Sequence, residues 1–325
     1  MLTRRHIRIK VMQALYGYSQ DGSVDQIPYL NSLKGSLDKI YQLYLLELSA
    51  LGQFHASAQT FVENAKKKHL PSQQDINPNL RFIQNPVMRA LRYNRQVLGS
   101  LERLVVENRK SDSELSAFNW TNHNDIFQKA YLEFRESEEY DAYMDSSKVT
   151  IDDHKKIAKH IYTKYIGQNE TMHQIYEDLN LHWADDIDAA QMMVVKTLKT
   201  MREDVDEFHP LVVLFKDVDD EDFGRKLFMA TANNQVEYEK LISEKTKNWE
   251  MERIAQLDII LLKMGLGELI NFPEIPVKVS LNEYIDLSKE YSTPKSGQFI
   301  NGVLDKLVIE LTEKKQIKKI GKGLL

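Results

Sequence analysis

Three arginines near the start of the chain carry the clearest chemistry in the sequence, which is the binding of a polyanion. Arg4, Arg5 and Arg8 lie in "RRHIRIKVMQALYGYSQ", and residues 1–20 add Lys10 and no acid, a net charge of +4. Arginine binds phosphates through paired N–H donors and stacks on bases, and aromatic side chains stack with every base. This segment therefore fits a surface that holds single-stranded RNA.

Catalytic and metal-binding patterns are not found elsewhere. The nine histidines never stand at i and i+4 with an intervening glutamate, and the chain has no cysteine, which removes cysteine–zinc sites and thiol catalysis. "GLG" at 265–267 follows no predicted strand, so it is not a phosphate loop. The acidic run "DVDDED" (217–222) lacks the glycine and spacing of a calcium loop and reads as a helix start. The sequence predicts neither an enzyme nor a cofactor.

The charge is distributed unevenly along the chain. The net charge is −5, yet residues 1–20 and residues 311–325 each carry +4, which leaves −13 for the rest. Basic ends on an acidic body suggest local contact with a polyanion, although the last lysines also fit an ordinary solvated tail. No apolar run reaches the length of about 18 residues that a membrane helix needs. With no cysteine, these features lead us to expect a cytoplasmic protein.

The elements that position these residues are all predicted to be helices. Apolar residues recur every three or four positions in the first 20 residues, from 29 to about 68, and from 87 to 108. Further helical stretches follow near 125–138, 152–166, 170–180 and 184–203, and again after residue 217. One apolar run, "FHPLVVLF" (208–215), resembles a strand but has no partner strand. The predicted class is all-α.

Two glycine-containing segments are predicted to lie inside helices. "KSGQFINGVLDK" (295–306) contains Asn301-Gly302, a strong hairpin signal, but the apolar residues recur every four positions through it. The spacing predicts a helix over 294–312, in which Gly302 costs about 1 kcal/mol relative to alanine. We expect close helix packing at Gly302 to offset this cost, so that Gly302→Leu destabilises the fold. The same reasoning applies to Gly265 and Gly267.

Two segments at opposite ends of the chain resemble one known family. "RRHIRIKVMQALY" resembles the arginine-led first helix of the NusB transcription antitermination factors. "IPVKVSLNEYIDLSKEYSTPKSGQFINGVLDK" (275–306) resembles the C-terminal signature of that family in order and spacing. The helix before it, around Glu268, is similar to the central helix of the family.

The resemblance implies an all-α, non-catalytic RNA-binding protein without a cofactor. Family members bind the boxA element of ribosomal RNA transcripts together with NusE, a small-subunit ribosomal protein, and so act on the RNA polymerase elongation complex and on ribosomal RNA synthesis. By position, the implied RNA-binding residues are Arg4, Arg5, Arg8, Lys295, Ser296, Gln298 and Phe299. Glu268 would belong to the side that faces NusE. Under this reading, Arg5→Ala or Arg8→Ala weakens RNA binding and leaves the melting temperature nearly unchanged.

The chain also departs from the family. Typical members are less than half as long, so residues 21–205 are expected to be a helical insertion of unknown role. Residues 1–20 and 206–312 would form the RNA-binding core, and residues 313–325 a basic tail. Many members carry an acid before the family serine, where this chain has Lys295.

Two other functions fit parts of the sequence. Some ribosomal RNA cytosine methyltransferases carry a NusB-like leading domain, so the chain could be the accessory RNA-binding part of an RNA-modification system. No glycine fingerprint of a methyltransferase domain is found, however. Alternatively, the insertion dominates and the protein is a helical protein-interaction module that has lost RNA binding. RNA affinity and its dependence on salt distinguish these possibilities.

Overall fold

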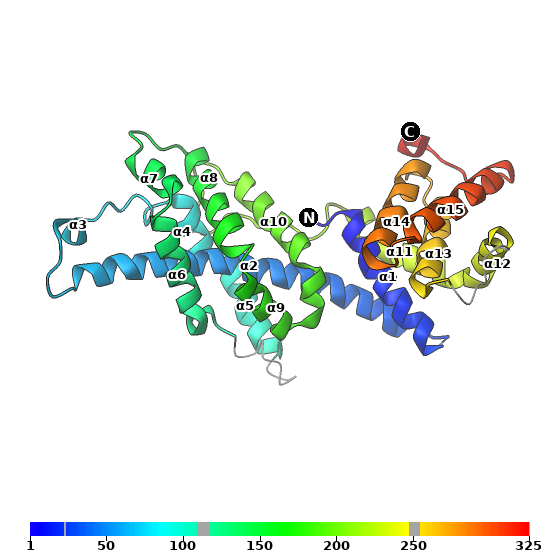
Figure 1. The fold of residues 1–325 in the computed structure, drawn as a ribbon, viewed down its shortest axis with the longest axis horizontal. Helices are drawn as coiled ribbons and strands as arrows, with labels where there is room; N and C mark the ends of the chain where they lie inside the picture. The colour runs from blue at the N-terminus through cyan, green and yellow to red at the C-terminus, as the bar shows by residue number, and fades with distance from the viewer. Residues whose placement is uncertain (23, 109–117, 247–253, 325) are drawn as a thin grey trace. The chain divides into compact units, whose positions relative to one another are not determined.

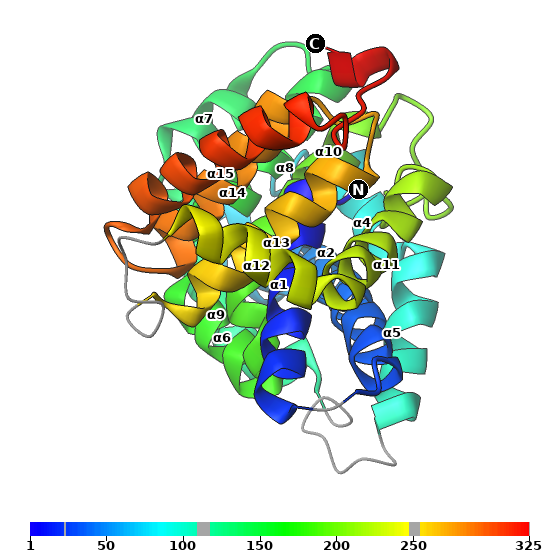
Figure 2. The same ribbon diagram turned by 90° about the vertical axis from the view of Figure 1, so that its right-hand side faces the viewer.

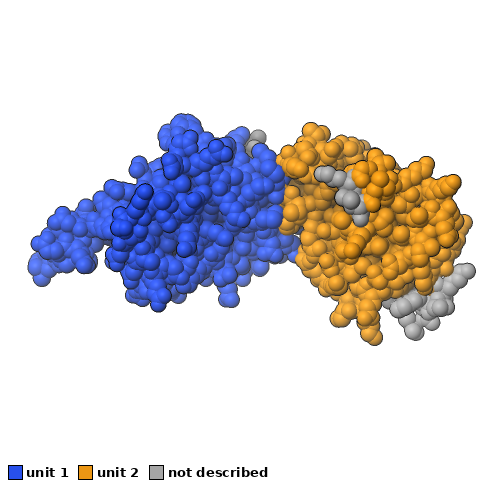
Figure 3. All heavy atoms as spheres, turned by 90° about the horizontal axis from the view of Figure 1, so that it is seen from above, with its two compact units in different colours: residues 1, 38–214 blue, residues 2–37, 215–325 orange. Residues whose placement is uncertain are grey.

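The computed structural model describes residues 1–22, 24–108, 118–246 and 254–324. Within these ranges every regular element is a helix, which confirms the all-α prediction (Figure 1 and Figure 2). The chain divides into two compact units, of which unit 1 comprises residues 1 and 38–214 and unit 2 comprises residues 2–37 and 215–325 (Figure 3). The first border falls inside helix α2 (Ile27–Lys66).

Unit 1 is a bundle of helices packed along the C-terminal part of α2. Its other helices are α3 (Gln73–Ile76), α4 (Pro86–Tyr93), α5 (Arg95–Asn108), α6 (Asn124–Arg135), α7 (Glu138–Asp145), α8 (Ile151–Ile161), α9 (Glu170–Leu179) and α10 (Ile187–Thr200). Short 3₁₀ turns cover Trp120–His123 and Leu181–Asp185, and a π-helical turn covers Tyr162–Ile166. Ile40, Tyr44, Leu48 and Leu51, at the three- and four-residue steps seen in the sequence, are buried.

One helix that the sequence predicts over 87–108 is in fact two. Asn94 separates α4 from α5, because its side-chain oxygen accepts hydrogen bonds from the amides of Gln96 and Val97 at 3.1 and 3.0 Å. An asparagine in this position starts a new helix by satisfying amides that have no partner inside it.

A carboxyl group lies in the core of unit 1. Glu47 on α2 is fully buried and accepts a hydrogen bond from the hydroxyl of Tyr162, the first residue of the π-helical turn. Burial raises the pKa of Glu47 to about 7, although the Tyr162 hydrogen bond lowers it. This hydrogen bond connects the π-helical turn, a local departure from regular helix geometry, to α2.

Unit 2 is built around α13 (Gln256–Asn271), which packs against α1, α11, α12, α14 and α15. Those helices are α1 (Arg4–Asp21), α11 (Val218–Asn233), α12 (Gln235–Lys245), α14 (Val277–Tyr291) and α15 (Ser296–Glu313). Every residue of α13 from Ile260 to Leu269 is buried, so this part of the helix has neighbours on all sides. A methyl group added at Gly265 would lie 3.2 Å from Leu304 Cδ2, and one at Gly267 would lie 3.0 Å from Thr231 Oγ1. The close packing predicted at Gly265 and Gly267 is confirmed.

The last long helix runs through Asn301-Gly302, as predicted, over 296–313 rather than 294–312. The packing reason given for Gly302 is wrong. Gly302 is exposed, and a methyl group added there would meet no atom within 4 Å. The overpacking expected of Gly302→Leu therefore has no basis, because the apolar stripe of α15 lies on the opposite side, at Phe299, Val303 and Leu307.

Gly302→Ala should stabilise the protein by about 1 kcal/mol, because alanine has the higher helix propensity and nothing obstructs its methyl group. The matched variant Gly265→Ala should destabilise it, because its methyl group would press on Leu304. Chemical unfolding followed by circular dichroism measures both. A loss of stability in Gly302→Ala comparable to that in Gly265→Ala would contradict this assignment.

The contribution of Glu47 to the stability of unit 1 should fall as the pH rises from about 4.5 to about 7. Buried His55 acts in the opposite direction, because burial lowers its pKa to about 4, so the difference between the wild type and a Glu47 variant isolates this contribution. The folded pKa of Glu47 is raised above its ordinary value, so the folded state retains a proton that the unfolded state has lost. Over this pH range, the titration of Glu47 lowers the free energy of unfolding by about 3 kcal/mol. Urea unfolding in a Trp249→Phe background, where Trp120 and Trp183 report on unit 1, measures this slope. Glu47→Gln should remove the contribution of Glu47, so that the free energy of unfolding falls less, or rises more, with pH than in the wild type. An equal pH slope in both proteins would contradict the assignment.

Candidate nucleic-acid interface

The arginines predicted to bind RNA all lie in the first two turns of α1, in unit 2. Thr3 precedes the helix, and its backbone amide donates to His6 Nδ1 at 3.3 Å, which satisfies one of the free donors at the helix start. Positions 4 and 8 are one turn apart, so Arg4 and Arg8 point toward the same side of α1. The three guanidinium groups nevertheless reach very different environments.

Arg8 is buried against Glu268 of α13. Its Nε and Nη2 atoms donate to the two oxygens of Glu268 at 2.7 and 2.8 Å, and the two side chains are 3% and 0% exposed. Ser280 and Tyr284 of α14 donate to the same carboxylate at 2.7 and 2.9 Å. The pKa of Arg8 lies above its ordinary value, because the hydrogen bond and charge of Glu268 outweigh the opposing effect of burial. Burial, reinforced by Glu268, also raises the pKa of Tyr284.

The surroundings leave Arg8 and Glu268 without access to the surface. The Arg8 guanidinium lies 5.3 Å from the ring centre of Phe223 on α11. Ser280 and Tyr284, the two side chains of α14 that donate to Glu268, are buried. RNA binding by Arg8 and partner binding by Glu268 stay predictions. A ligand would reach either charged group only if the packing of α1 on α13 opened.

Arg5 lies at the edge of this cluster and is 33% exposed. Its Nη2 atom donates to Glu290 Oε2 at 2.8 Å, and its Nη1 atom lies 3.8 Å from Glu283 Oε2. Glu283 also lies 3.4 Å from Arg8 Nη1. Glu283 and Glu290 are two helical turns apart on α14, so one face of that helix presents two carboxylates to α1.

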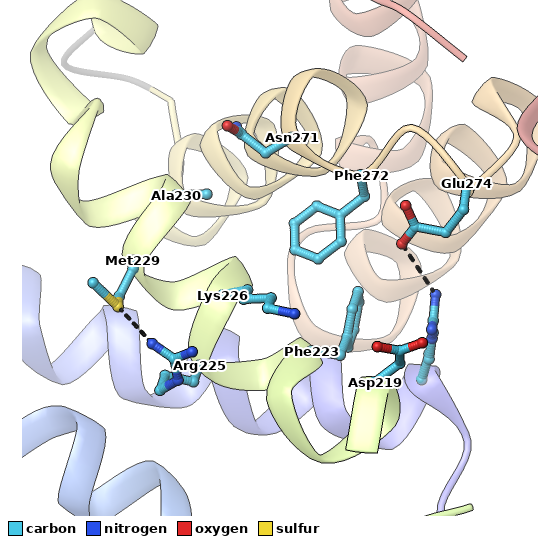
Figure 4. Close-up of a pocket in the computed structure, with 10 residues that line it drawn as sticks. Asp219, Phe223, Arg225, Lys226, Met229, Ala230, Asn271, Phe272 and Glu274 are labelled. Atoms are coloured by element: carbon cyan, nitrogen blue, oxygen red, sulfur yellow. Dashed lines mark hydrogen bonds and ion pairs between the residues drawn. The ribbon is translucent and has the colours of Figure 1, made fainter. Parts of the chain in front are cut away.

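Arg4 borders a depression on the surface of unit 2 with a volume of about 670 Å³ (Figure 4). Its Nε atom donates to Asp220 at 2.8 Å, and its guanidinium stacks over Phe223 at 4.9 Å from the ring centre. The depression lies between α1, α11 and the end of α13, and its other lining residues are Asp219, Arg225, Lys226, Met229, Ala230, Asn271, Phe272 and Glu274. The Nη1 atom of Arg4 lies 3.8 Å from Glu274 Oε1.

The predicted residues at the start of α15 divide between surface and core. Lys295 and Gln298 are exposed, whereas Ser296 and Phe299 are 1% and 8% exposed. The hydroxyl of Ser296 donates to Asp258 at 2.7 Å and accepts from the amide of Thr293 at 3.1 Å. Ser296 therefore joins α15 to α13, and a ligand in this region would meet Lys295 and Gln298 first.

Two further segments of unit 2 lie at opposite ends of α13. Tyr16 on α1 is 41% exposed, close in sequence to Ser19, which accepts a hydrogen bond from Gln256 at 3.0 Å. The basic tail lies against the end of α13, because Lys319 Nζ donates to the carbonyl of Phe272 at 2.9 Å.

Comparison with known proteins shows the family to which the sequence is similar. Residues 186–308 match the sequence model of the NusB family. The chain is 39% identical over 142 residues to the transcription antitermination protein NusB of Salinibacter ruber, covering 42% of this chain and 89% of that protein. It is 35% identical over 97 residues to the NusB of Desulfatibacillum aliphaticivorans, covering 30% and 68% respectively. The NusB of Chloroherpeton thalassium is 31% identical over 137 residues, covering 41% and 65%. No solved structure matches the chain.

The chain belongs to the NusB family. The predicted membership of the NusB family is thereby confirmed. The family match includes the C-terminal segment and begins inside unit 1, at residue 186, and the resemblance of the first helix stays a prediction. No group of three or more metal-type ligands lies among the residues that the structure describes. Over the same ranges, no helix is long and apolar enough to cross a membrane.

The carboxylates that pair with the arginines were not predicted from the sequence. Glu290 and Glu268 are separated from their partners by 285 and 260 residues, so no local pattern connects them. The sequence held part of this information, because the seven-residue spacing of Glu283 and Glu290 places both carboxylates on one face of α14. The spacing does not indicate which arginines they contact.

Arg8→Ala should reduce the stability of unit 2 by about 3–5 kcal/mol, because it leaves the buried Glu268 carboxylate without its counter-charge. The double variant Arg8→Met with Glu268→Leu should recover much of this loss, since no buried charge remains. This replaces the expectation that Arg8→Ala leaves the melting temperature nearly unchanged. A melting temperature within one or two degrees of wild type would contradict the structural role of Arg8.

Proposed function

We propose that this protein is a non-catalytic RNA-binding transcription antitermination factor that binds boxA-type RNA of ribosomal RNA transcripts together with NusE. Membership of the NusB family, whose compared relatives are named transcription antitermination proteins, supports the general role. The observation that carries RNA binding is the partly exposed guanidinium of Arg5 at the start of α1. Guanidinium groups in this setting bind phosphates in two-pronged geometry.

Unit 2 is proposed to carry the RNA-binding function. The exposed cations Lys295 and Arg225 add to Arg4 and Arg5. The three arginines lie on α1 and α11, and Lys295 directly precedes α15; all three helices pack against α13. Unbound single strands present phosphates and unstacked bases, so cations interspersed with exposed side chains such as Gln298 and Tyr16 suit them. Unit 1 has a core of its own and is proposed to be an added helical domain.

A second function rests on unit 1. Its surface exposes large apolar side chains, among them Leu181 at 81% and Phe208 at 69%. Exposed aromatic and aliphatic side chains are frequent in protein–protein contacts. If unit 1 dominates, the protein is a helical interaction module without RNA affinity.

The test is a titration of fluorescent boxA-type RNA with the full-length protein, at two salt concentrations, with and without NusE. RNA binding should weaken with salt by a log–log slope of about −0.7 per neutralised phosphate. NusE should strengthen binding, and a scrambled RNA should bind less tightly.

Arg5→Ala should weaken binding at low salt and flatten the slope by about 0.7, because one phosphate contact is lost. Lys240→Ala, which removes an exposed cation from α12, is the matched control and should bind as the wild type does. Salt-independent binding, or no binding in either condition, would favour the interaction module instead.

A further inference from the structure

Three cations of the proposed RNA-binding surface, Arg4, Arg5 and Arg225, are already paired with carboxylates of their own chain. Arg5 contacts Glu290, and Arg4 contacts Asp220, each at 2.8 Å. On α11, Asp222 lies 3.2 Å from Arg225 and 3.4 Å from Lys226. A phosphate that approaches one of these three side chains therefore meets a cation that already has a carboxylate partner.

The pair between Arg5 and Glu290 is open to exchange, unlike the buried pair of Arg8. The Arg5 side chain is 33% exposed and that of Glu290 is 49% exposed, whereas Arg8 and Glu268 are 3% and 0% exposed. Pairs exposed to solvent contribute little to stability, because water competes for both partners and salt screens them. Breaking the Arg5 pair thus costs the fold little.

We propose that Glu290 is an internal competitor of the RNA, which holds the guanidinium of Arg5 in the free protein and is displaced when a phosphate binds. The inference rests on the proposed function and concerns the regulation of the same surface. A carboxylate and a phosphate require the same two N–H donors, so Arg5 cannot bind both in two-pronged geometry. The affinity for RNA then depends on the difference in free energy between Arg5 paired with a phosphate and Arg5 paired with Glu290.

Glu290 is better suited to this role than the neighbouring Glu283. Glu283 lies 3.8 Å from Arg5 and 3.4 Å from the buried Arg8, so replacing it would also disturb the core. Glu290 contacts Arg5 alone among the arginines of α1. Its replacement tests competition without touching the pair of Arg8 and Glu268.

Glu290→Gln should raise the affinity for RNA by about two- to fivefold at low salt, the range that corresponds to an exposed ion pair. The gain should shrink at high salt, because screening weakens the competing pair. Glu237→Gln removes an exposed carboxylate from α12 and is the matched control. Its affinity should equal that of the wild type.

The same substitution in an Arg5→Ala background separates competition from a general effect of charge. Competition predicts no gain there, since Glu290 has no Arg5 to hold. An equal gain in both backgrounds, or in Glu237→Gln, would overturn the proposal in favour of long-range electrostatics.

The outcomes also separate this inference from the proposed function. Wild-type protein that binds RNA, loses affinity in Arg5→Ala and gains none in Glu290→Gln overturns the competition alone. RNA binding that appears only in Glu290→Gln supports it. If neither protein binds boxA-type or scrambled RNA, the proposed function and the competition both fail.

Discussion

The buried ion pair between Arg8 and Glu268 is the interaction on which the rest of unit 2 depends. It connects the first helix of the chain to a central helix 260 residues later, and Ser280 and Tyr284 of α14 complete its hydrogen bonds. A carboxylate in the core is tolerated only with such partners, because an unpaired buried charge costs several kcal/mol. The pair therefore fixes how α1 is rotated on α13, and with it the direction of Arg4 and Arg5.

This constraint divides three similar residues into two physical classes. The guanidinium of Arg8 is removed from solvent and acts within the fold, whereas those of Arg4 and Arg5 lie at its edge and are 29% and 33% exposed. A phosphate in solvent can approach the second class directly, whereas it would reach the first only if the packing of α1 on α13 opened. The two partly exposed arginines are thus positioned by a third that is buried.

Much of the fold could be predicted from the sequence, because it depends on local periodicity. The spacing of apolar residues located α1, α2, α13 and α15, and the order of the end segments indicated the family. The side-chain partners could not be predicted in this way. Tertiary packing between distant segments decides whether Gly302 faces solvent or a neighbouring helix. It also decides whether an arginine of α1 contacts Glu268. The sequence therefore indicated which residues carry charge and not which of them water can reach.

Arg8 acts within the fold, whereas Arg5 can exchange its carboxylate partner for a phosphate. The most direct test is nuclear magnetic resonance of the side-chain Nε–H groups in the full-length chain labelled with ¹⁵N-arginine. Single Arg→Lys variants would assign the signals. The account predicts that the Arg8 proton exchanges slowly with water and does not move when boxA-type RNA is added, while the Arg5 signal exchanges rapidly and shifts. A rapidly exchanging Arg8 signal that shifts with RNA, in a protein that remains folded, would contradict it.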